Sequence, residues 1–167
     1  MGKLSTRRDF GQFAAGIGMT AAVAPQKSSA ADAADLRSEF LFDLALTTQP
    51  QSEIGRDRVV VAVSGGTFDG PRIKGTVIGP TGDWMVQRRD GSRLLDVRAL
   101  LQTDDDQRVY MMWRGIAYTP PGGPLYARIL PMFETGAAKY AWLNNVVAVG
   151  VYRPTAGKIV YRVYQIL

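Results

Sequence analysis

The chain has 167 residues and a formal net charge of +5, from 20 lysines and arginines against 15 aspartates and glutamates. It contains no cysteine and no histidine, which excludes disulfides, thiolate nucleophiles, iron–sulfur clusters, imidazole metal sites and Ser-His-Asp catalysis. Its length suits one domain, and without histidine any proton transfer must use Asp, Glu, Tyr or Lys side chains with shifted pKa values.

Residues 1–33 have the features of an export signal of the twin-arginine type. Arg7 and Arg8 precede an apolar run at residues 13–24, and residues 31–33 fit a small-x-small cleavage site. The run is shorter than the roughly 20 residues that span a bilayer. We therefore expect cleavage, the export machinery as a partner, no stable membrane anchor afterwards, and a periplasmic or extracellular location. The alternative is an N-terminal amphipathic helix that the protein retains.

Residues 34–167 form the predicted single domain, which we expect to be all-β. Alternating or continuous apolar residues predict strands at 40–46, 59–63, 72–78, 84–89, 94–103, 109–118, 146–152 and 158–166. Residues 125–132 fit a strand or a short helix, and residues 137–144 fit a helical turn. Asp90-Gly91 predicts a two-residue hairpin turn. Eight to ten short strands at this spacing fit a single antiparallel β-barrel, lipocalin-like in shape.

Glycines interrupt this pattern at residues 65–75, where four glycines and a proline lie in strand-like sequence. Glycine permits positive φ or a close approach of two backbones, which indicates curvature of the kind that closes a barrel. Residues 79–82 predict a turn between two strands. We expect Asp83 to fix that turn through backbone hydrogen bonds, with a catalytic role as the alternative. Residues 49–55 have the composition of a linker.

Several separated motifs carry a family resemblance. They are the glycine segment 65–75, Asp83-Trp84, Phe-Glu-Thr-Gly at 133–136 and Tyr-Ala-Trp-Leu-Asn at 140–144. In this order and spacing the chain resembles family 3237 of the domains of unknown function, from about residue 40 to its C-terminus. The resemblance implies a compact antiparallel β-barrel with a partly polar interior. For some members it also implies cofactor-free lyase, decarboxylase or isomerase chemistry on aromatic molecules. Between residues 118 and 133 the chain departs from the family, since many relatives are longer there.

The candidate catalytic residues are Glu134, Asp96 and Tyr140. A carboxylate beside aromatic rings can have a pKa raised toward neutrality, which suits Glu134 to general acid–base work, with Asp96 as a second carboxylate. Tyr140 could donate a hydrogen bond to a developing oxyanion. The structural alternative is that Glu134 caps a turn through backbone N–H groups and that Tyr140 fills the core.

The candidate ligand-binding residues are Arg98, Arg114, Trp142, Tyr110 and Trp84. Asp96 and Arg98 share one face of a predicted strand, and Tyr110 and Arg114 share a face of the next. We expect these faces to line the lumen, where the arginines hold an anion and Trp142 walls a ring. The alternative is an exposed ion pair worth about 0–1 kcal/mol.

Together these patterns predict an exported β-barrel that binds a small aromatic or anionic molecule in its lumen, with cofactor-free acid–base catalysis. The alternatives are a non-catalytic periplasmic ligand-binding protein and a fully packed structural barrel. We expect no cofactor and no metal, because the glycine segment lacks a phosphate-loop Gly-Lys-Ser/Thr and residues 104–106 lack calcium-loop spacing. Outside the expected export signal the charged residues alternate in sign and form no patch, so no nucleic-acid partner is expected. Strand edges and exposed aromatics are compatible with a homodimer.

Overall fold

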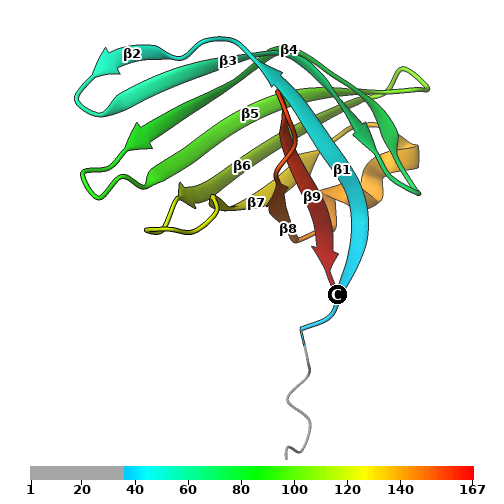
Figure 1. Cartoon of the computed structure of the whole chain (residues 1–167). Helices are drawn as coiled ribbons and strands as arrows, with labels where there is room; N and C mark the ends of the chain where they lie inside the picture. Colours follow the sequence, from blue (N-terminus) through cyan, green and yellow to red (C-terminus); the bar gives the residue numbers. More distant parts are fainter. Residues whose placement is uncertain (1–35) are drawn as a thin grey trace, which may run out of the picture. The chain divides into compact units, whose positions relative to one another are not determined.

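The alternating apolar residues form nine antiparallel strands in the computed structural model, which describes residues 36–167 (Figure 1). The elements are β1 (Ser38–Thr48), β2 (Ser52–Gly55), β3 (Arg58–Asp69), β4 (Lys74–Gln87), β5 (Arg93–Thr103), β6 (Arg108–Tyr118), β7 (Tyr126–Glu134), the 3-10 helix η1 (Ala138–Asn145), β8 (Ala148–Arg153) and β9 (Ile159–Ile166). The predicted export signal lies outside the described residues. Among residues 36–167, no helix is long and apolar enough to cross a membrane.

The sheet closes on itself because β1 pairs with both β9 and β3. Consecutive strands from β3 to β9 pair in chain order, so eight strands form the barrel. The short β2 pairs only with β3 and extends that hairpin. This confirms the predicted antiparallel β-barrel with its helical turn near residues 137–144.

Three local expectations were wrong. The strands predicted at 72–78 and 84–89 are one strand, β4, because residues 79–82 form a bulge where the β4–β5 register shifts between Ile78 and Gly82. The segment that resembled a linker contains β2. The Asp90-Gly91 connection is wider than two residues: it runs from 88 to 92, with the Gly91 N–H donating to the carbonyl of Arg88.

Antiparallel strands place their connections at two opposite ends of the barrel. At one end, which we call the closed end, lie the β3–β4 and β5–β6 hairpins and η1, which buries Tyr140 and Leu143. At the other, the mouth, lie the β2–β3, β4–β5, β6–β7 and β8–β9 connections (Figure 1). The β4–β5 and β6–β7 connections lie on the left of the view.

Aromatic rings fill the closed half of the interior. Phe42 is fully buried, and its ring meets those of Phe68 and Phe133 edge-on at centroid distances of 5.8 and 5.9 Å. Edge-to-face pairs of this kind add about 0.5–1.5 kcal/mol beyond the area they bury. Gly75 lets β4 and β5 approach here, because a Cβ at this position would collide with the backbone of Gln102. This confirms the expected role of the glycine segment.

Candidate functional site

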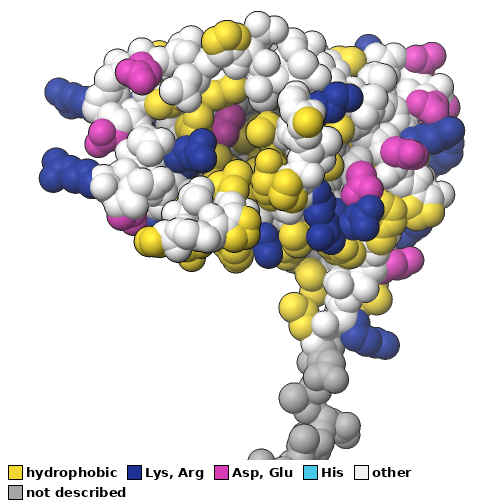
Figure 2. Space-filling view, viewed as in Figure 1, with side chains coloured by type: hydrophobic (Ala, Val, Ile, Leu, Met, Phe, Trp, Pro, Cys, Tyr) yellow, Lys and Arg dark blue, Asp and Glu magenta, His cyan; other side chains and the backbone are white. Residues whose placement is uncertain are grey.

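The mouth half of the barrel is hollow. A cavity of about 260 Å³ opens there, and most of its wall is apolar, from residues that include Leu46, Val63, Met85, Leu95, Val97 and Ile159. Figure 2 shows this hollow lined with hydrophobic side chains, with an acidic group visible inside it. An apolar cavity of about 150 Å³ holds benzene, so this one has room for an aromatic ring with short substituents. The fully packed barrel considered from the sequence is therefore wrong for the mouth half.

Asp83 is the carboxylate of this cavity. It lies opposite Val97 in the β4–β5 ladder, and this register turns both side chains inward. Its Oδ1 accepts the backbone N–H of Asp96 at 3.0 Å. The pKa of Asp83 is raised to about 6, mainly because the carboxyl is buried; the Asp96 N–H and the Arg93 guanidinium lower the pKa, and the charge of Asp96 raises it. The expectation that Asp83 fixes a turn was wrong, since residues 79–82 lie within a strand.

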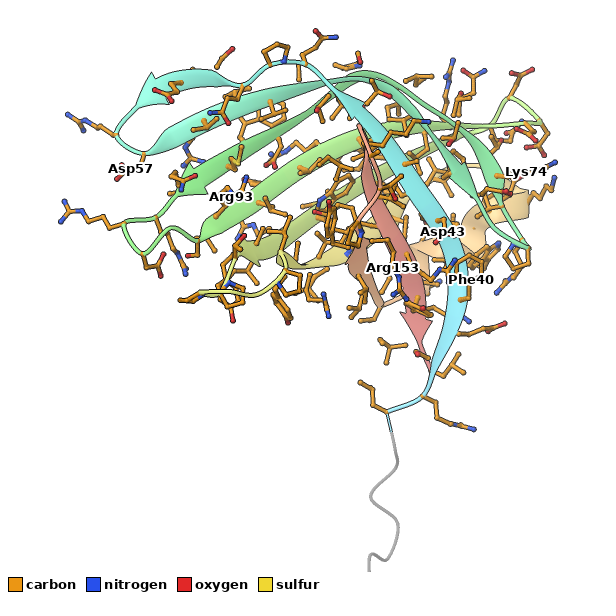
Figure 3. The ribbon with its side chains drawn as sticks, viewed as in Figure 1. Phe40, Asp43, Asp57, Lys74, Arg93 and Arg153 are labelled. Atoms are coloured by element: carbon orange, nitrogen blue, oxygen red, sulfur yellow. The ribbon has the colours of Figure 1, made fainter. Side chains whose placement is uncertain are left out.

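Arg93 is the cation of the cavity. It is the first residue of β5 and shares the inward alternation of Leu95 and Val97, which places it at the mouth (Figure 3). The four ion pairs found within residues 36–167 do not include it. Because no carboxylate of the described residues lies within ion-pair distance, this half-buried guanidinium can offer its N–H donors to a ligand that enters the mouth.

Three aromatic side chains with polar groups complete the cavity wall. Tyr152 and Tyr161 meet edge-on with ring centroids 6.0 Å apart. Burial raises the pKa of Tyr161 far above its ordinary value, and the charge of Asp83 raises it further, so its hydroxyl stays protonated. Trp113 also lines the cavity; its indole N–H is buried without an acceptor in the part of the chain described. Tyrosine and tryptophan thus supply donors around one ionisable acid.

The structure places Asp96, Arg98 and Arg114 on the outer wall, so the expectation that they line the lumen was wrong. Asp96 and Arg98 form an outward ion pair at 3.1 Å, which matches the surface alternative. Arg114 lies opposite Asp96 in the β5–β6 ladder and is exposed. The physical reason is that Leu95, Val97 and the other odd-numbered residues of β5 take the interior.

Glu134 and Tyr110 also lie outside the lumen. They are cross-strand neighbours on the outer face of β6 and β7, where they border a shallow depression together with Arg108, Thr135 and Asn144. Glu134 is exposed, and Thr135 is clamped by two hydrogen bonds to the Asn144 side chain, of 2.8 and 3.0 Å. Outward placement of Glu134 was not expected.

The remaining candidates are also away from the cavity. Tyr140 is buried at the closed end, where its hydroxyl donates to the Asp105 carboxylate at 2.8 Å, so the core-filling alternative describes it. The Arg72 guanidinium stacks on Trp142, with its Cζ 3.6 Å from the centroid of the ring. Trp84 faces outward and is 41% exposed. None of the catalytic and ligand-binding candidates chosen from the sequence lines the mouth cavity.

Arg93, Tyr152 and Tyr161 line the cavity but were not expected from the sequence as site residues. A signal for Arg93 was present, since it shares the odd-numbered alternation of the apolar residues in its strand. The two tyrosines carried no comparable signal, because aromatic residues in strands most often fill the core. Within residues 36–167, no three or more His, Cys, Asp or Glu side chains are grouped so as to hold a metal ion.

Comparison with known proteins agrees with the barrel and its motifs. The family model described as "Protein of unknown function (DUF3237)" matches residues 36–166. A hydroalkoxylation enzyme from Penicillium herquei is 34% identical over 117 residues, which cover 67% of this chain and 71% of that enzyme. A protein from Rhodopseudomonas palustris is 31% identical over 129 residues, 69% of this chain and 84% of its own length.

Solved structures share the fold. A β-barrel-like protein from Acinetobacter baumannii superposes with a TM-score of 0.73 at 28% identity, over 79% of this chain and 96% of that one. An enzyme from Penicillium herquei superposes with a TM-score of 0.67 at 29% identity, over 79% of this chain and 95% of its own.

Proposed function

The chain belongs to the DUF3237 family, and we propose that its mouth cavity binds a small unsaturated aromatic molecule and catalyses cofactor-free acid–base addition or elimination on it. Asp83 is the proton-transfer residue. Arg93 binds or orients the substrate at the mouth, and Tyr161 and Trp113 offer hydrogen-bond donors within the wall.

One observation carries this proposal: a carboxyl group with a pKa of about 6 lies in an otherwise apolar cavity large enough for an aromatic ring. Proton transfer is most efficient when the pKa of the catalytic group lies near the working pH. Asp83 is therefore available both as acid and as base close to neutrality. Glu134 and Asp96, the carboxylates expected from the sequence to be catalytic, face outward and do not have this environment.

The hydroalkoxylation enzyme among the relatives supports the reaction class. Hydroalkoxylation adds an O–H bond across a carbon–carbon double bond. Protonated Asp83 gives its proton to one alkene carbon, the substrate hydroxyl oxygen bonds to the other carbon, and the hydroxyl proton returns to the Asp83 carboxylate. The step balances without an oxidant or a reductant. Within one molecule it is an isomerisation, and its reverse is an elimination of the lyase type.

The test uses 2-allylphenol, which carries a hydroxyl group and an alkene on one ring. Cyclisation gives a dihydrobenzofuran of the same mass, which gas chromatography separates from the substrate. We expect turnover by the full-length protein, and a loss of roughly 10²- to 10⁴-fold in Asp83→Asn. Glu134→Gln, which alters an exposed carboxylate on the outer face and away from the cavity, is the control and keeps its rate. Equal rates for Asp83→Asn and the wild type would contradict the assignment.

A second outcome of this experiment is informative. If the wild-type protein binds the ring compound but converts neither 2-allylphenol nor its cyclic product, the non-catalytic ligand-binding alternative replaces the enzyme. Binding can be followed through fluorescence quenching of Trp113, with Trp113→Phe as the control for the two other tryptophans.

We further propose that the protein is exported by the twin-arginine route and acts in the periplasm or outside the cell. The support is the order of Arg7-Arg8, the apolar run and the small-residue cleavage motif. Fusing residues 1–33 to a reporter that is active only after export tests this proposal, with Arg7→Lys and Arg8→Lys together as the transport-defective control. A cytosolic reporter with the wild-type segment would contradict it.

A further inference from the structure

Positive charge is concentrated at the mouth of the barrel. The mouth segments, residues 49–58, 88–93, 119–125 and 154–158, contain six cations: Arg56, Arg58, Arg88, Arg89, Arg93 and Lys158. They contain only three acids, Glu53, Asp57 and Asp90. The connections at the closed end, residues 70–73, 104–107 and 135–147, carry two cations and three acids. The field of the domain is therefore positive at the entrance to its cavity.

None of these six mouth cations forms an ion pair within the described residues. The four ion pairs there are Lys74–Asp104, Arg98–Asp96, Lys139–Asp105 and Arg162–Asp43. All four belong to the outer wall or to the closed end. Asp90, the acid nearest to Arg88 and Arg89 in the chain, has an oxygen occupied by the backbone N–H and hydroxyl of Ser92. Figure 2 shows Lys and Arg side chains on both sides of the hollow.

Arg93 lies between the interior of the barrel and the other five mouth cations, which we call the rim cations. It alone of the six mouth cations lines the cavity, and it is half-buried, whereas the other five are exposed. Within residues 36–167 no carboxylate lies at ion-pair distance from this guanidinium, although its charge acts on the Asp83 carboxyl, so a ligand carboxylate can take the position of a direct partner. The planar fork of Arg93 matches a carboxylate with two parallel hydrogen bonds.

We propose that the natural ligand of the mouth cavity is an aromatic carboxylate, whose ring enters the apolar cavity while its carboxylate binds Arg93. This inference rests on the proposed use of the cavity as a ligand site, and it narrows the ligand to an anion. The rim cations attract the anion from solution, because a charged entrance raises the local concentration of an oppositely charged ligand.

A carboxylate bound at Arg93 also acts on Asp83. Asp83 is faced by Arg93 and Asp96 from β5 and by Tyr161 from β9. A second negative charge in the cavity favours the protonated form of Asp83, so ligand binding prepares the carboxyl as an acid. Arg93 and Asp83 thereby divide the work: one residue holds the anion, and the other supplies the proton.

The experiment compares cinnamate with cinnamamide, which have the same shape and number of non-hydrogen atoms but differ in charge. Binding to the full-length protein is measured by isothermal titration calorimetry at low ionic strength. We expect cinnamate to bind at least about tenfold more tightly, since a hydrogen bond to a charged group contributes about 1.5–3 kcal/mol. Arg93→Gln abolishes this preference. Arg114→Gln, which removes the same charge from the outer wall, preserves it.

The rim cations are expected to increase the association rate of the ligand. In stopped-flow measurements the association rate of cinnamate falls as salt rises through about 0.1 M, where the screening length is about 10 Å. Replacing Arg88 and Arg89 together by Gln lowers that rate and its salt dependence, while the dissociation rate stays within about twofold.

The outcomes separate the two proposals. Equal affinity for cinnamate and cinnamamide, or a cinnamate preference that survives Arg93→Gln, overturns the anion inference but leaves a ligand cavity in place. Failure of both compounds and of 2-allylphenol to bind in the millimolar range overturns both proposals. A preference for cinnamate without turnover of 2-allylphenol supports the anion site and contradicts only the catalytic proposal.

Discussion

Asp83→Asn is expected to stabilise the protein at neutral pH, even though it removes the group to which we assign catalysis. The wild-type carboxyl has a pKa of about 6 in the folded protein against an ordinary value of 3.8, mainly because it is buried. Asparagine keeps the size of the side chain and an oxygen that can accept the Asp96 N–H. What the substitution removes is the ionisation of a buried group.

The sign follows from the proton balance. Between about pH 4 and pH 6 the unfolded chain has lost the Asp83 proton while the folded protein retains it, so the free energy of unfolding decreases as pH rises. Each pKa unit between the folded and unfolded states corresponds to about 1.4 kcal/mol, so the raised pKa of Asp83 lowers the free energy of unfolding by about 3 kcal/mol in total. Below this window both states are protonated, and above it both are ionised, so this contribution is constant on either side.

Urea unfolding of the full-length wild type, Asp83→Asn and Glu134→Gln across this range measures the effect. The gain in unfolding free energy of Asp83→Asn over the wild type should be small near pH 4 and should grow to about 3 kcal/mol above pH 7. Glu134→Gln, at an exposed carboxylate on the outer face, should show no such growth. A constant difference between Asp83→Asn and the wild type at all pH values would refute the assignment of a buried, proton-binding Asp83.

Three further outcomes follow from the same structure. Phe42→Ala should lower the free energy of unfolding by about 3–5 kcal/mol in urea titrations, because a fully buried ring in contact with Phe68 and Phe133 is lost. Gly75→Ala should cost about 1–3 kcal/mol by the same measurement, since its Cβ meets the Gln102 backbone, whereas Gly136→Ala, in open space, should stay within about 0.5 kcal/mol. Binding of cinnamate near pH 7 should take up a fraction of a proton in the wild type and none in Asp83→Asn. Calorimetry in buffers of different ionisation enthalpy measures that uptake, and equal uptake in both proteins would rule out Asp83 as its source.

The barrel could be predicted from the sequence because its determinants are local. Alternation of apolar residues marks each strand, and short connections between strands favour neighbouring antiparallel pairs. The merger of two predicted strands into β4 could not be seen in this way. A Gly-Pro-Thr-Gly segment has the composition of a turn, and only pairing with two neighbouring strands holds it in a bulge.

The site could not be predicted because both faces of β5 mix polar and apolar residues. Asp96 and Arg98 make one face conspicuous, yet Leu94 and Leu100 lie on that same outward face. The inward face begins with a charged residue, Arg93, and continues with Leu95 and Val97. One polar residue at the end of an apolar alternation resembles a strand boundary, although at a barrel mouth it marks the entrance to the lumen.

The two ends of the barrel divide stability from function. At the closed end, the Asp105 carboxylate accepts hydrogen bonds from Lys139, Thr103 and Tyr140, which hold its pKa well below the ordinary range. The bonds from Lys139 and Tyr140 join η1 to the β5–β6 turn. At the mouth, Asp83 is a carboxyl disfavoured by burial, and Arg93 lacks an ion-pair partner within the described residues. Charged groups that do not stabilise the fold, and whose burial lowers its stability, are expected at sites where a ligand supplies their missing partner. Substitutions at the closed end should therefore reduce stability, whereas substitutions at the mouth should alter ligand binding and, for Asp83, increase stability.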